Sequence, residues 1–312
     1  MPSAAITGWG SALPDQVLTN ADLEARLDTS DRWIVERTGI SERRVGGTTS
    51  GLAIAAAGEA LDRAGLTGTQ IDLVLVSTNT PDQPVPATAA YVHEALGVTG
   101  GAVDLNSGCS GFVYGLVMAN GVIATGLERI LLVASDTVSR IVDPGDRSTA
   151  VLFGDGAGAV VLQAVPGEPA LLGFDLGADG GAAPLLHQPA GGYVHMDGRE
   201  VFRKAVRATA ASAEAALERA KVGVDDITLF VPHQANLRII EAVNHRLGIP
   251  LERTALVVER TGNTSSASIP LALCDAVDTG RLRDGDLVLM AGFGAGMTWA
   301  SAVWRWSRPS GA

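Results

Sequence analysis

Cysteine, lysine and long apolar runs are scarce in this sequence of 312 residues, and each scarcity argues against a class of protein. With only two cysteines, Cys109 and Cys274, and no Cys/His cluster at metal-ligand spacing, we expect neither a disulfide framework nor a metal site. No stretch reaches the roughly 18 apolar residues of a membrane span. The segment Met1–Pro14 lacks the basic flank and apolar core of a signal peptide, so a reduced, cytoplasmic setting is expected.

Positive charge is also in deficit. The formal net charge is −11, which argues against nucleic acid as a partner. Hydrophobic residues make up 46% and charged residues 18%, proportions typical of a well-buried globular protein. The 38 glycines, beside only 4% aromatic residues, indicate backbones packed closely around sites. The length fits one large domain or two of ordinary size.

The second half of the chain repeats the pattern of the first. The apolar run 71–76, its loop and the helix ending at Leu96–Gly97 correspond to residues 227–248. The helices that end at 124–126 and 278–280, and the runs 131–135 and 287–291, match likewise, each at an offset of about 155 residues. Two strand–helix repeats with buried parallel strands predict an α/β protein of two packed halves, residues 1–165 and 166–312.

Local signals add expectations at several junctions. Strands are expected at 102–105, 150–153 and 255–258, and Asn20 is expected to cap a helix over 22–27. The run 154–158 lacks the spacing of a dinucleotide-binding loop, so a tight turn is expected there. The first half inserts residues 136–149 between its last two strands, which marks a functional or interface loop.

The segment 103–112 (VDLNSGCSGF) predicts a strand that runs into a helix over 112–124, with Cys109 at the helix's first turn. Unpaired N–H groups and the positive end of the helix dipole meet at such a turn and favour a thiolate, the nucleophilic form. On this segment alone the alternative is a buried cysteine that serves as a small hydrophobe, the commoner fate of a free thiol.

Two polar motifs follow apolar runs in the second half: 231–239 (VPHQANLRI) and 262–270 (GNTSSASIP). Cys109 and Asn263 occupy matching turns of the repeat, and His233 also follows a strand, so we expect the three side chains to lie near the junction of the halves. The alternatives are a loop histidine bonded to backbone for His233 and a helix cap for Asn263.

These three motifs, with LTNADL at 18–23 and GMTW at 296–299, resemble β-ketoacyl-acyl-carrier-protein synthase III, the initiating condensing enzyme of fatty acid synthesis. The resemblance implies a thiolase-like fold of two pseudo-symmetric halves in an αβαβα arrangement, and a homodimer. It implies that Cys109 attacks an acyl-CoA, while His233 and Asn263 stabilise the enolate left when malonyl-acyl-carrier protein loses CO₂. The backbone N–H groups of Cys109 and Ala295 then form the oxyanion hole, although many relatives have glycine at the second position.

The resemblance also implies binding sites for both substrates. Trp33 and Arg147 would hold the adenine of CoA, although Ser148 follows Arg147 where glycine is usual, and a surface anchor is the alternative for Trp33. The whole expected CoA-binding set is Thr29, Trp33, Arg37, Arg147, Gly198, Asn236 and Arg238. The expected carrier-protein docking set is Arg203, Lys204, Gln234, Ala235, Asn236, Leu237, Arg238 and Arg246.

The acyl pocket implied by the resemblance comprises Val85, Val138, Leu152 and Phe153. The loop 83–86 would reach in from the neighbouring subunit, and some straight-chain enzymes of the family carry phenylalanine where Val85 stands. The smaller side chain leads us to expect propionyl, butyryl or branched starters beside acetyl. No metal and no cofactor other than the acyl-CoA substrate is expected.

Other functions remain open at this point. A dedicated priming ketosynthase or acyltransferase of a polyketide or secondary-metabolite pathway would use the same triad. A non-decarboxylating acyltransferase or thioesterase would leave Asn263 without a role, and an inactive partner subunit would have a broken triad. The remaining histidines, His93, His187, His195 and His245, are expected to be structural, and Cys274 is expected in the core.

Overall fold

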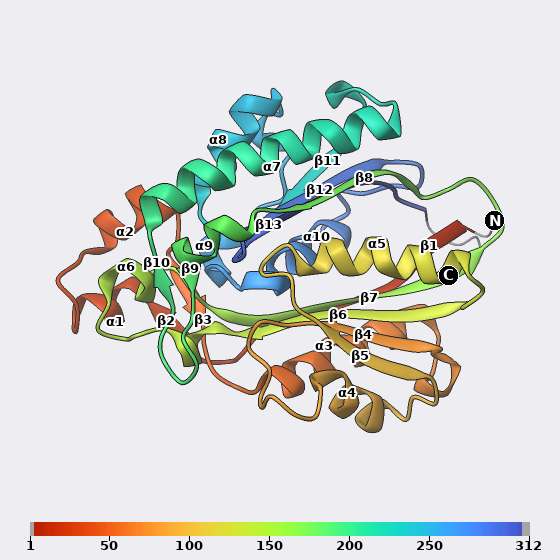
Figure 1. Ribbon diagram of the computed structural model, residues 1–312, viewed down its shortest axis with the longest axis horizontal. Helices are drawn as coiled ribbons and strands as arrows, with labels where there is room; N and C mark the ends of the chain where they lie inside the picture. The colour runs from red at the N-terminus through yellow and green to blue at the C-terminus, as the bar shows by residue number, and fades with distance from the viewer. Residues whose placement is uncertain (1–2, 308–312) are drawn as a thin grey trace.

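Two β-sheets lie face to face with a pair of helices between them and further helices outside (Figure 1), in a computed structural model that describes residues 3–307. The central helices are α5 (Gly111–Ala124) and α10 (Ser268–Asp278). On the outside, α3 (Thr49–Ala64) and α4 (Thr88–Leu96) cover the first sheet, and α7 (Gly198–Ala220) and α8 (Leu237–Leu247) cover the second. The predicted αβαβα layering is confirmed.

The two sheets repeat the same strand order. The first sheet runs β1-β7-β6-β4-β5, and these strands are Ser3–Ala12, Asp155–Val165, Arg129–Thr137, Leu73–Ser77 and Gly101–Leu105. The second runs β8-β13-β12-β11, and these strands are Leu171–Ala178, Thr298–Arg305, Leu287–Gly294 and Leu229–Pro232. In both, the inner strands β4/β6 and β11/β12 are parallel, while the next pairings, β6/β7 and β12/β13, are antiparallel. The sheets divide between Val165 and Leu171.

The repeat is incomplete at one edge. No strand occupies 255–258, where one was expected; the counterpart of β5 is reduced to a single bridge between Phe230 and Thr254. The N–H groups of Val257 and Val258 donate instead to the side-chain oxygen of Gln234, and the short helix α9 (Val258–Thr261) follows. The buried side chain of Gln234 therefore takes the place of a strand neighbour.

Three other local predictions were wrong for identifiable reasons. Residues 150–153 form no strand, because Asp146 caps the short helix α6 (Arg147–Ala150) just before them. Residues 155–158 of the expected turn at 154–158 belong to β7 instead; a Cβ at Gly158 would lie 2.7 Å from the Cβ of Pro270, so glycine lets this strand approach α10. The cap of α1 (Asn20–Glu24) is Thr19, whereas Asn20 turns inward and donates to the carbonyl of Ile40.

The smaller elements gather at one end of the layers, at the left in Figure 1. They are α2 (Asp31–Thr38), β2 (Val17–Thr19), β3 (Glu42–Arg44), β9 (Leu186–His187) and β10 (His195–Met196), together with α1 and α6. Short 3₁₀ helices are η1 (Gly68–Gln70), η2 (Val138–Ile141), η3 (Gly180–Leu185), η4 (Val224–Asp226), η5 (Leu251–Arg253) and η6 (Ser265–Ala267).

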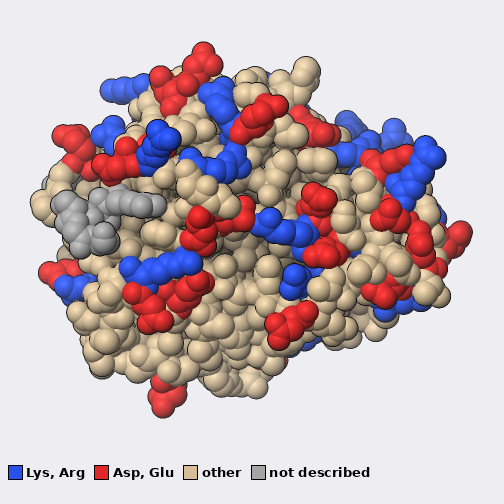
Figure 2. Space-filling view, turned by 180° about the vertical axis from the view of Figure 1, so that it is seen from behind, with Lys and Arg blue, Asp and Glu red and all other residues tan. Residues whose placement is uncertain are grey.

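Charge is distributed without segregation on the face opposite to that of Figure 1. There, basic and acidic side chains are interspersed over the surface (Figure 2). Within residues 3–307, no helix combines the length and the apolar character that crossing a membrane requires.

Candidate active site

Cys109 lies between β5 and α5, at the wall of a cavity of about 250 Å³. Helix α5 begins at Gly111 with Ser110 as its N-cap, so the cysteine precedes the helix and does not lie in its first turn. Burial raises the pKa of the Cys109 thiol to about 12, and the nearby charge of Asp136 acts in the same direction. A hydrogen bond to Ser265 works against both effects. The resting cysteine is therefore a thiol, contrary to the thiolate that the sequence suggested.

The end of β12 packs directly against the cysteine's own backbone. A Cβ at Gly294 would lie 2.2 Å from the backbone nitrogen of Cys109, and one at Gly108 would lie 2.7 Å from that of Ala295. Gly108 also has a φ of +61°, a conformation that L side chains rarely adopt. Glycine at both positions thus lets the two segments touch, and the N–H groups of Cys109 and Ala295 lie on adjoining backbone beside the cavity.

His233 follows β11 and is buried, with Phe293 packed edge-on against its ring. Its Nδ1 lies 2.7 Å from the hydroxyl of Ser268, and that hydroxyl accepts a bond from the N–H of Gln234. Among residues 3–307, Nδ1 is the acceptor within reach of the Ser268 hydrogen, so we assign the hydrogen to this bond, which leaves the ring proton on Nε2. Burial lowers the pKa of His233 to about 3, so the ring is a neutral donor at physiological pH.

Asn263 is also buried, just ahead of η6. Its side-chain oxygen accepts the backbone N–H of Ser265 at 2.9 Å. Among residues 3–307 the amide nitrogen has no acceptor, so this group remains available as a donor. The sequence suggested that Asn263 caps a helix. In the structure its side chain caps only the short turn at Ser265, because α10 itself begins later, at Ser268.

The structure brings the three predicted triad residues together around the end of β12. A Cβ at Gly292 would lie 3.5 Å both from the Cβ of His233 and from the Cα of Ser110, the residue after Cys109. Asn263 is linked to the cysteine through Ser265, whose hydroxyl oxygen lies 3.4 Å from the sulfur. One half of the fold thus supplies a thiol, and the other supplies two neutral hydrogen-bond donors.

Two arginines expected at the CoA site lie over one tryptophan. The guanidinium carbons of Arg147, from α6, and Arg37, from α2, lie 4.7 and 5.0 Å from the ring centroid of Trp33. Arg147 also donates to the carbonyl of Asp28 at 2.6 Å, next to Thr29. Trp33 is therefore more than an isolated surface anchor.

The helices that carry the expected docking residues, α7 and α8, lie side by side (Figure 1), and Arg238 reaches over the ring of Phe202 between them. Arg203, Arg238 and Arg246 are exposed. Lys204 pairs with Asp179 at 2.8 Å, and Arg203 pairs with Glu200 at 2.9 Å.

The remaining members of the CoA and docking sets fall into two groups. Gly198 is the first residue of α7, and Asn236 caps α8 by accepting the N–H of Ile239. Leu237 is half-buried behind that cap. Gln234 and Ala235 are buried, so their side chains cannot contact a docked protein. We therefore remove these two residues from the expected docking set.

The expected acyl-pocket residues separate in the single chain. Val138 and Phe153 line the Cys109 cavity. Leu152 does not line it, and its carbonyl accepts the backbone N–H of Asn263. Val85 is 81% exposed and does not line this cavity. Its place in a pocket stays a prediction that depends on a second subunit.

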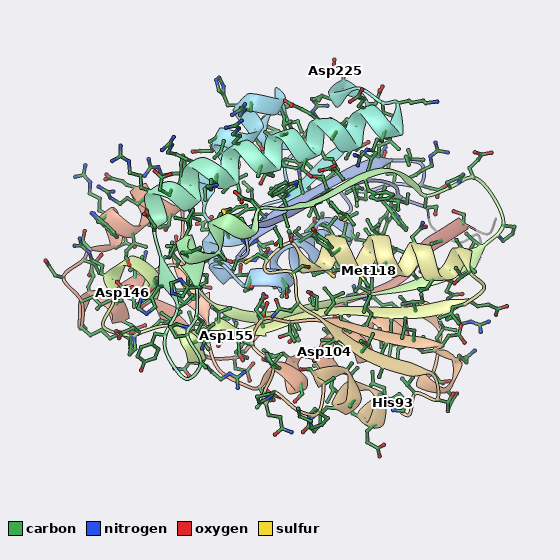
Figure 3. The ribbon with its side chains drawn as sticks, in the orientation of Figure 1. His93, Asp104, Met118, Asp146, Asp155 and Asp225 are labelled. Atoms are coloured by element: carbon green, nitrogen blue, oxygen red, sulfur yellow. The ribbon has the colours of Figure 1, made fainter. Side chains whose placement is uncertain are left out.

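Sequence reasoning missed the residues that hold the triad: Asn79, Asp136, Ser265 and Ser268. The two serines lie inside the GNTSSAS motif, where their spacing gave no hint of their partners. Among the histidines expected to be structural, His93 lies on the outer helix α4 (Figure 3) and contacts the carbonyl of Gly100. His187, in contrast, lines the Cys109 cavity and stacks on His195.

A duplicated αβαβα fold with a cysteine in one half and a neutral His–Asn pair in the other is the architecture of a thiolase-like condensing enzyme. Residues 103–180 match the family model for 3-oxoacyl-[acyl-carrier-protein] synthase III, and residues 217–306 match the model for its C-terminal part. The chain belongs to the β-ketoacyl-[acyl-carrier-protein] synthase III family of acyltransferases.

Individual relatives agree with this assignment. The chain is 52% identical to β-ketoacyl-[acyl-carrier-protein] synthase III of Roseiflexus castenholzii, over 97% of this chain and 98% of the relative. It resembles the crystal structure of 3-oxoacyl-[acyl-carrier-protein] synthase III from Aquifex aeolicus with a TM-score of 0.96 and 42% identity, over 97% and 100% of the two chains. It is also similar to the priming β-ketosynthase of the R1128 polyketide pathway, with a TM-score of 0.93 and 37% identity over 99% and 97% of the chains.

Proposed function

We propose that this enzyme condenses an acyl-CoA starter with malonyl-acyl-carrier protein to give 3-oxoacyl-acyl-carrier protein, the first condensation of fatty acid synthesis. The observation that carries the proposal is the pair of neutral donors, His233 Nε2–H and the Asn263 amide, set beside a cysteine at a cavity wall. A hydrolase needs a base to activate water, and a histidine whose pKa is about 3 does not serve as one.

In the first half-reaction, the sulfur of Cys109 attacks the thioester carbonyl of the acyl-CoA. The negative charge that develops on the carbonyl oxygen is stabilised by the N–H groups of Cys109 and Ala295. The carbon–sulfur bond to CoA then breaks, the thiol proton passes to the departing CoA sulfur, and the acyl group remains on Cys109. The contact between the Gly294 and Cys109 backbones supports this oxyanion hole.

In the second half-reaction, malonyl-acyl-carrier protein loses CO₂, and its thioester oxygen becomes an enolate. His233 and Asn263 donate to that oxygen as charge develops, which is the role neutral donors serve best. The enolate carbon attacks the acyl carbonyl, the bond to Cys109 breaks, and the released thiolate takes up a proton from water. The product is the 3-oxoacyl thioester on the carrier protein.

The substrates would bind at the same end of the molecule. An adenine held by Trp33 and Arg147 requires that Arg147 moves, since 4.7 Å between guanidinium and ring leaves no space for a further ring. The bond from Arg147 to the Asp28 carbonyl would break at that point. The exposed Arg203, Arg238 and Arg246 give the acidic chain a local basic surface for an acidic carrier protein.

We further propose that the enzyme acts as a homodimer in the cytoplasm, with no cofactor beyond the acyl-CoA substrate. Val103 on the edge strand β5 is 46% exposed. Met118 on α5 (Figure 3) is 50% exposed. An unpaired sheet edge beside an exposed apolar helix face is typical of a pairing surface. The two free cysteines fit a reducing compartment.

The direct test is to combine the purified enzyme with a short acyl-CoA and malonyl-acyl-carrier protein, and to identify the carrier-bound product by mass spectrometry. The 3-oxoacyl species is expected, and release of free acid or unextended acyl-carrier protein would contradict the proposal. A priming ketosynthase of a polyketide pathway is the second candidate, because the chain is 37% identical to such an enzyme. Comparing the fatty acid and polyketide carrier proteins of the source organism as acceptors separates the two.

A further inference from the structure

Behind Cys109 runs a chain of polar side chains that the two half-reactions above do not use. The hydroxyl oxygen of Ser265 lies 3.4 Å from the sulfur of Cys109. The side-chain nitrogen of Asn79 lies 2.8 Å from that oxygen and 3.2 Å from a carboxylate oxygen of Asp136. Asn79 and Ser265 line the cavity with Cys109, whereas Asp136 is fully buried. The chain crosses from the first half of the fold to the second.

The chemistry of these groups fixes the direction of the hydrogen bonds that lead from Asp136 through Asn79 to the Ser265 oxygen. An ionised carboxylate only accepts, and that of Asp136 accepts seven bonds, from Thr78, Asn79, Thr80 and Ser266. The Asn79 amide therefore presents its nitrogen to Asp136 and, with the other hydrogen, to Ser265. Because the Ser265 oxygen accepts that bond, its own hydrogen is free to point at the sulfur of Cys109.

The backbone of Ser265 is held in an uncommon conformation. Its φ is +54°, in the left-handed region that few residues other than glycine adopt. Its N–H donates to the side-chain oxygen of Asn263 at 2.9 Å. In this conformation one residue contacts both the nucleophile, through its hydroxyl, and the amide donor of the second half-reaction, through its backbone.

We infer that Ser265 is a further catalytic residue, which donates a hydrogen bond to the Cys109 sulfur as negative charge forms on it, and that Asn79 and Asp136 are positioning residues that aim the Ser265 hydroxyl. The inference rests on the proposed function, because the charge on sulfur arises in acylation and again when the sulfur leaves in condensation. Ser265 keeps its own proton throughout. A charge-assisted bond of this kind is stronger than a neutral one, so it favours the transition state over the resting thiol.

The test measures the reactivity of Cys109 with a small probe, iodoacetamide, which alkylates the sulfur with loss of iodide. Ser265→Ala is expected to lower the second-order rate constant about 10-fold or more at each pH from 6 to 9, because thiolate formation loses its donor. Acylation by acyl-CoA should fall in parallel. Decarboxylation of malonyl-acyl-carrier protein should persist, because the alanine retains the backbone N–H that holds Asn263.

Ser212→Ala is the matched control. Its hydroxyl is also buried, but it lies on α7 and has no hydrogen-bond partner among residues 3–307, so the alkylation rate should stay at the wild-type value. Should Ser265→Ala fail to fold, Asn79→Ala provides the second variant; it leaves the serine hydroxyl without its fixed partner and should also slow alkylation. Equal rates for wild type and Ser265→Ala, or an equal loss in Ser212→Ala, would overturn the inference.

The outcome is separable from that of the proposed function. A wild type that makes 3-oxoacyl-acyl-carrier protein while Ser265→Ala acylates normally would refute only the role of Ser265. A wild type that makes no condensation product would refute the proposed function, whatever the alkylation rates of the variants.

Discussion

The two halves of the repeat carry their chemistry at matching turns, yet they place it in different surroundings. Cys109 follows β5, an exposed edge strand, and borders an open cavity. Asn263 stands at the equivalent turn, where the strand has shrunk to one bridge, and it is buried. The first half thus keeps the sulfur half-buried at a cavity wall, where the proposed mechanism needs it to form a covalent bond. The second half shields two groups whose hydrogen bonds gain strength away from water.

The two halves also differ in the titratable group that each contributes: Cys109 in the first half and His233 in the second. Burial raises the pKa of the Cys109 thiol and lowers that of the His233 ring, and both shifts favour the neutral form. The resting site therefore carries no charge on either group. Charge arises only during reaction, on sulfur in one half and on the enolate oxygen facing the other.

The largest expected effect comes from removing the group that belongs to the first half alone. Cys109→Ala should abolish acylation, measured by intact-protein mass after incubation with acyl-CoA. Cys109→Gln should likewise block condensation, yet it should still decarboxylate malonyl-acyl-carrier protein, because the donors in the second half remain. Cys274→Ala is the control, since that thiol is buried away from the cavity, and it should acylate normally.

Removing a hydrogen-bond donor from the second half should slow decarboxylation and leave acylation intact. His233→Ala or Asn263→Ala is expected to slow decarboxylation by roughly 10²- to 10³-fold, the usual cost of losing one donor to a developing charge. Acylation of Cys109 should continue at a similar rate. An equal loss in both half-reactions would show that the halves do not divide the chemistry in this way.

The acidity of the two groups predicts different pH profiles. A histidine with its ordinary pKa of 6.5 would lose its neutral form as the pH falls through that value, whereas His233, with a pKa of about 3, should stay neutral. Decarboxylation by Cys109→Gln should therefore be level between pH 5.5 and 8. Alkylation of Cys109 in the wild type should rise about tenfold per pH unit over the same range, because its thiol titrates near 12. A decarboxylation limb near pH 6.5 would contradict the neutral buried ring.

The lowered pKa of His233 also predicts how the stability of the folded protein depends on pH. Unfolded His233 binds a proton below about pH 6.5 and the folded ring does not, so the protein should lose stability as the pH falls below that value. Replacing His233 by Gln should reduce this loss in denaturant titrations at pH 5 and 7.

The smallest expected effect concerns the starter and requires the second subunit. If Val85 lines the partner's pocket, Val85→Phe should shift preference toward acetyl-CoA by about 10- to 200-fold per methylene-sized step, measured as relative kcat/KM for acetyl- and butyryl-CoA. Leu251→Ala, which removes another exposed apolar side chain but lies on η5, outside the loop 83–86 and the proposed pairing surface, is the control and should leave the preference unchanged. No change in Val85→Phe would remove Val85 from the pocket.

The duplicated fold could be predicted from the sequence because it depends on local patterns, and so could the proximity of Cys109, His233 and Asn263. Strand length and helix periodicity marked the repeat, and Cys109, His233 and Asn263 stand in motifs long enough to be distinctive. The supporting residues could not be predicted in this way. Asn79 and Asp136 are 57 residues apart, and Asp136 and Ser266 are 130 apart, so only tertiary structure shows that they meet. Gln234 was expected at the docking surface because the sequence does not show that it is buried. Its side chain bonds the carbonyl of Ala255 and the N–H of Val257, and only the tertiary structure brings these groups to it.

The central claim is that the first half supplies the nucleophile and the second half supplies donors for a later step. Its most direct test is to incubate the wild-type enzyme with acyl-CoA alone, locate the adduct by peptide mass mapping, and then add malonyl-acyl-carrier protein. We predict a single acyl group on Cys109, which disappears as 3-oxoacyl-acyl-carrier protein forms. An unmodified Cys109, or an acyl-Cys109 that persists when the carrier protein is added, would contradict the account.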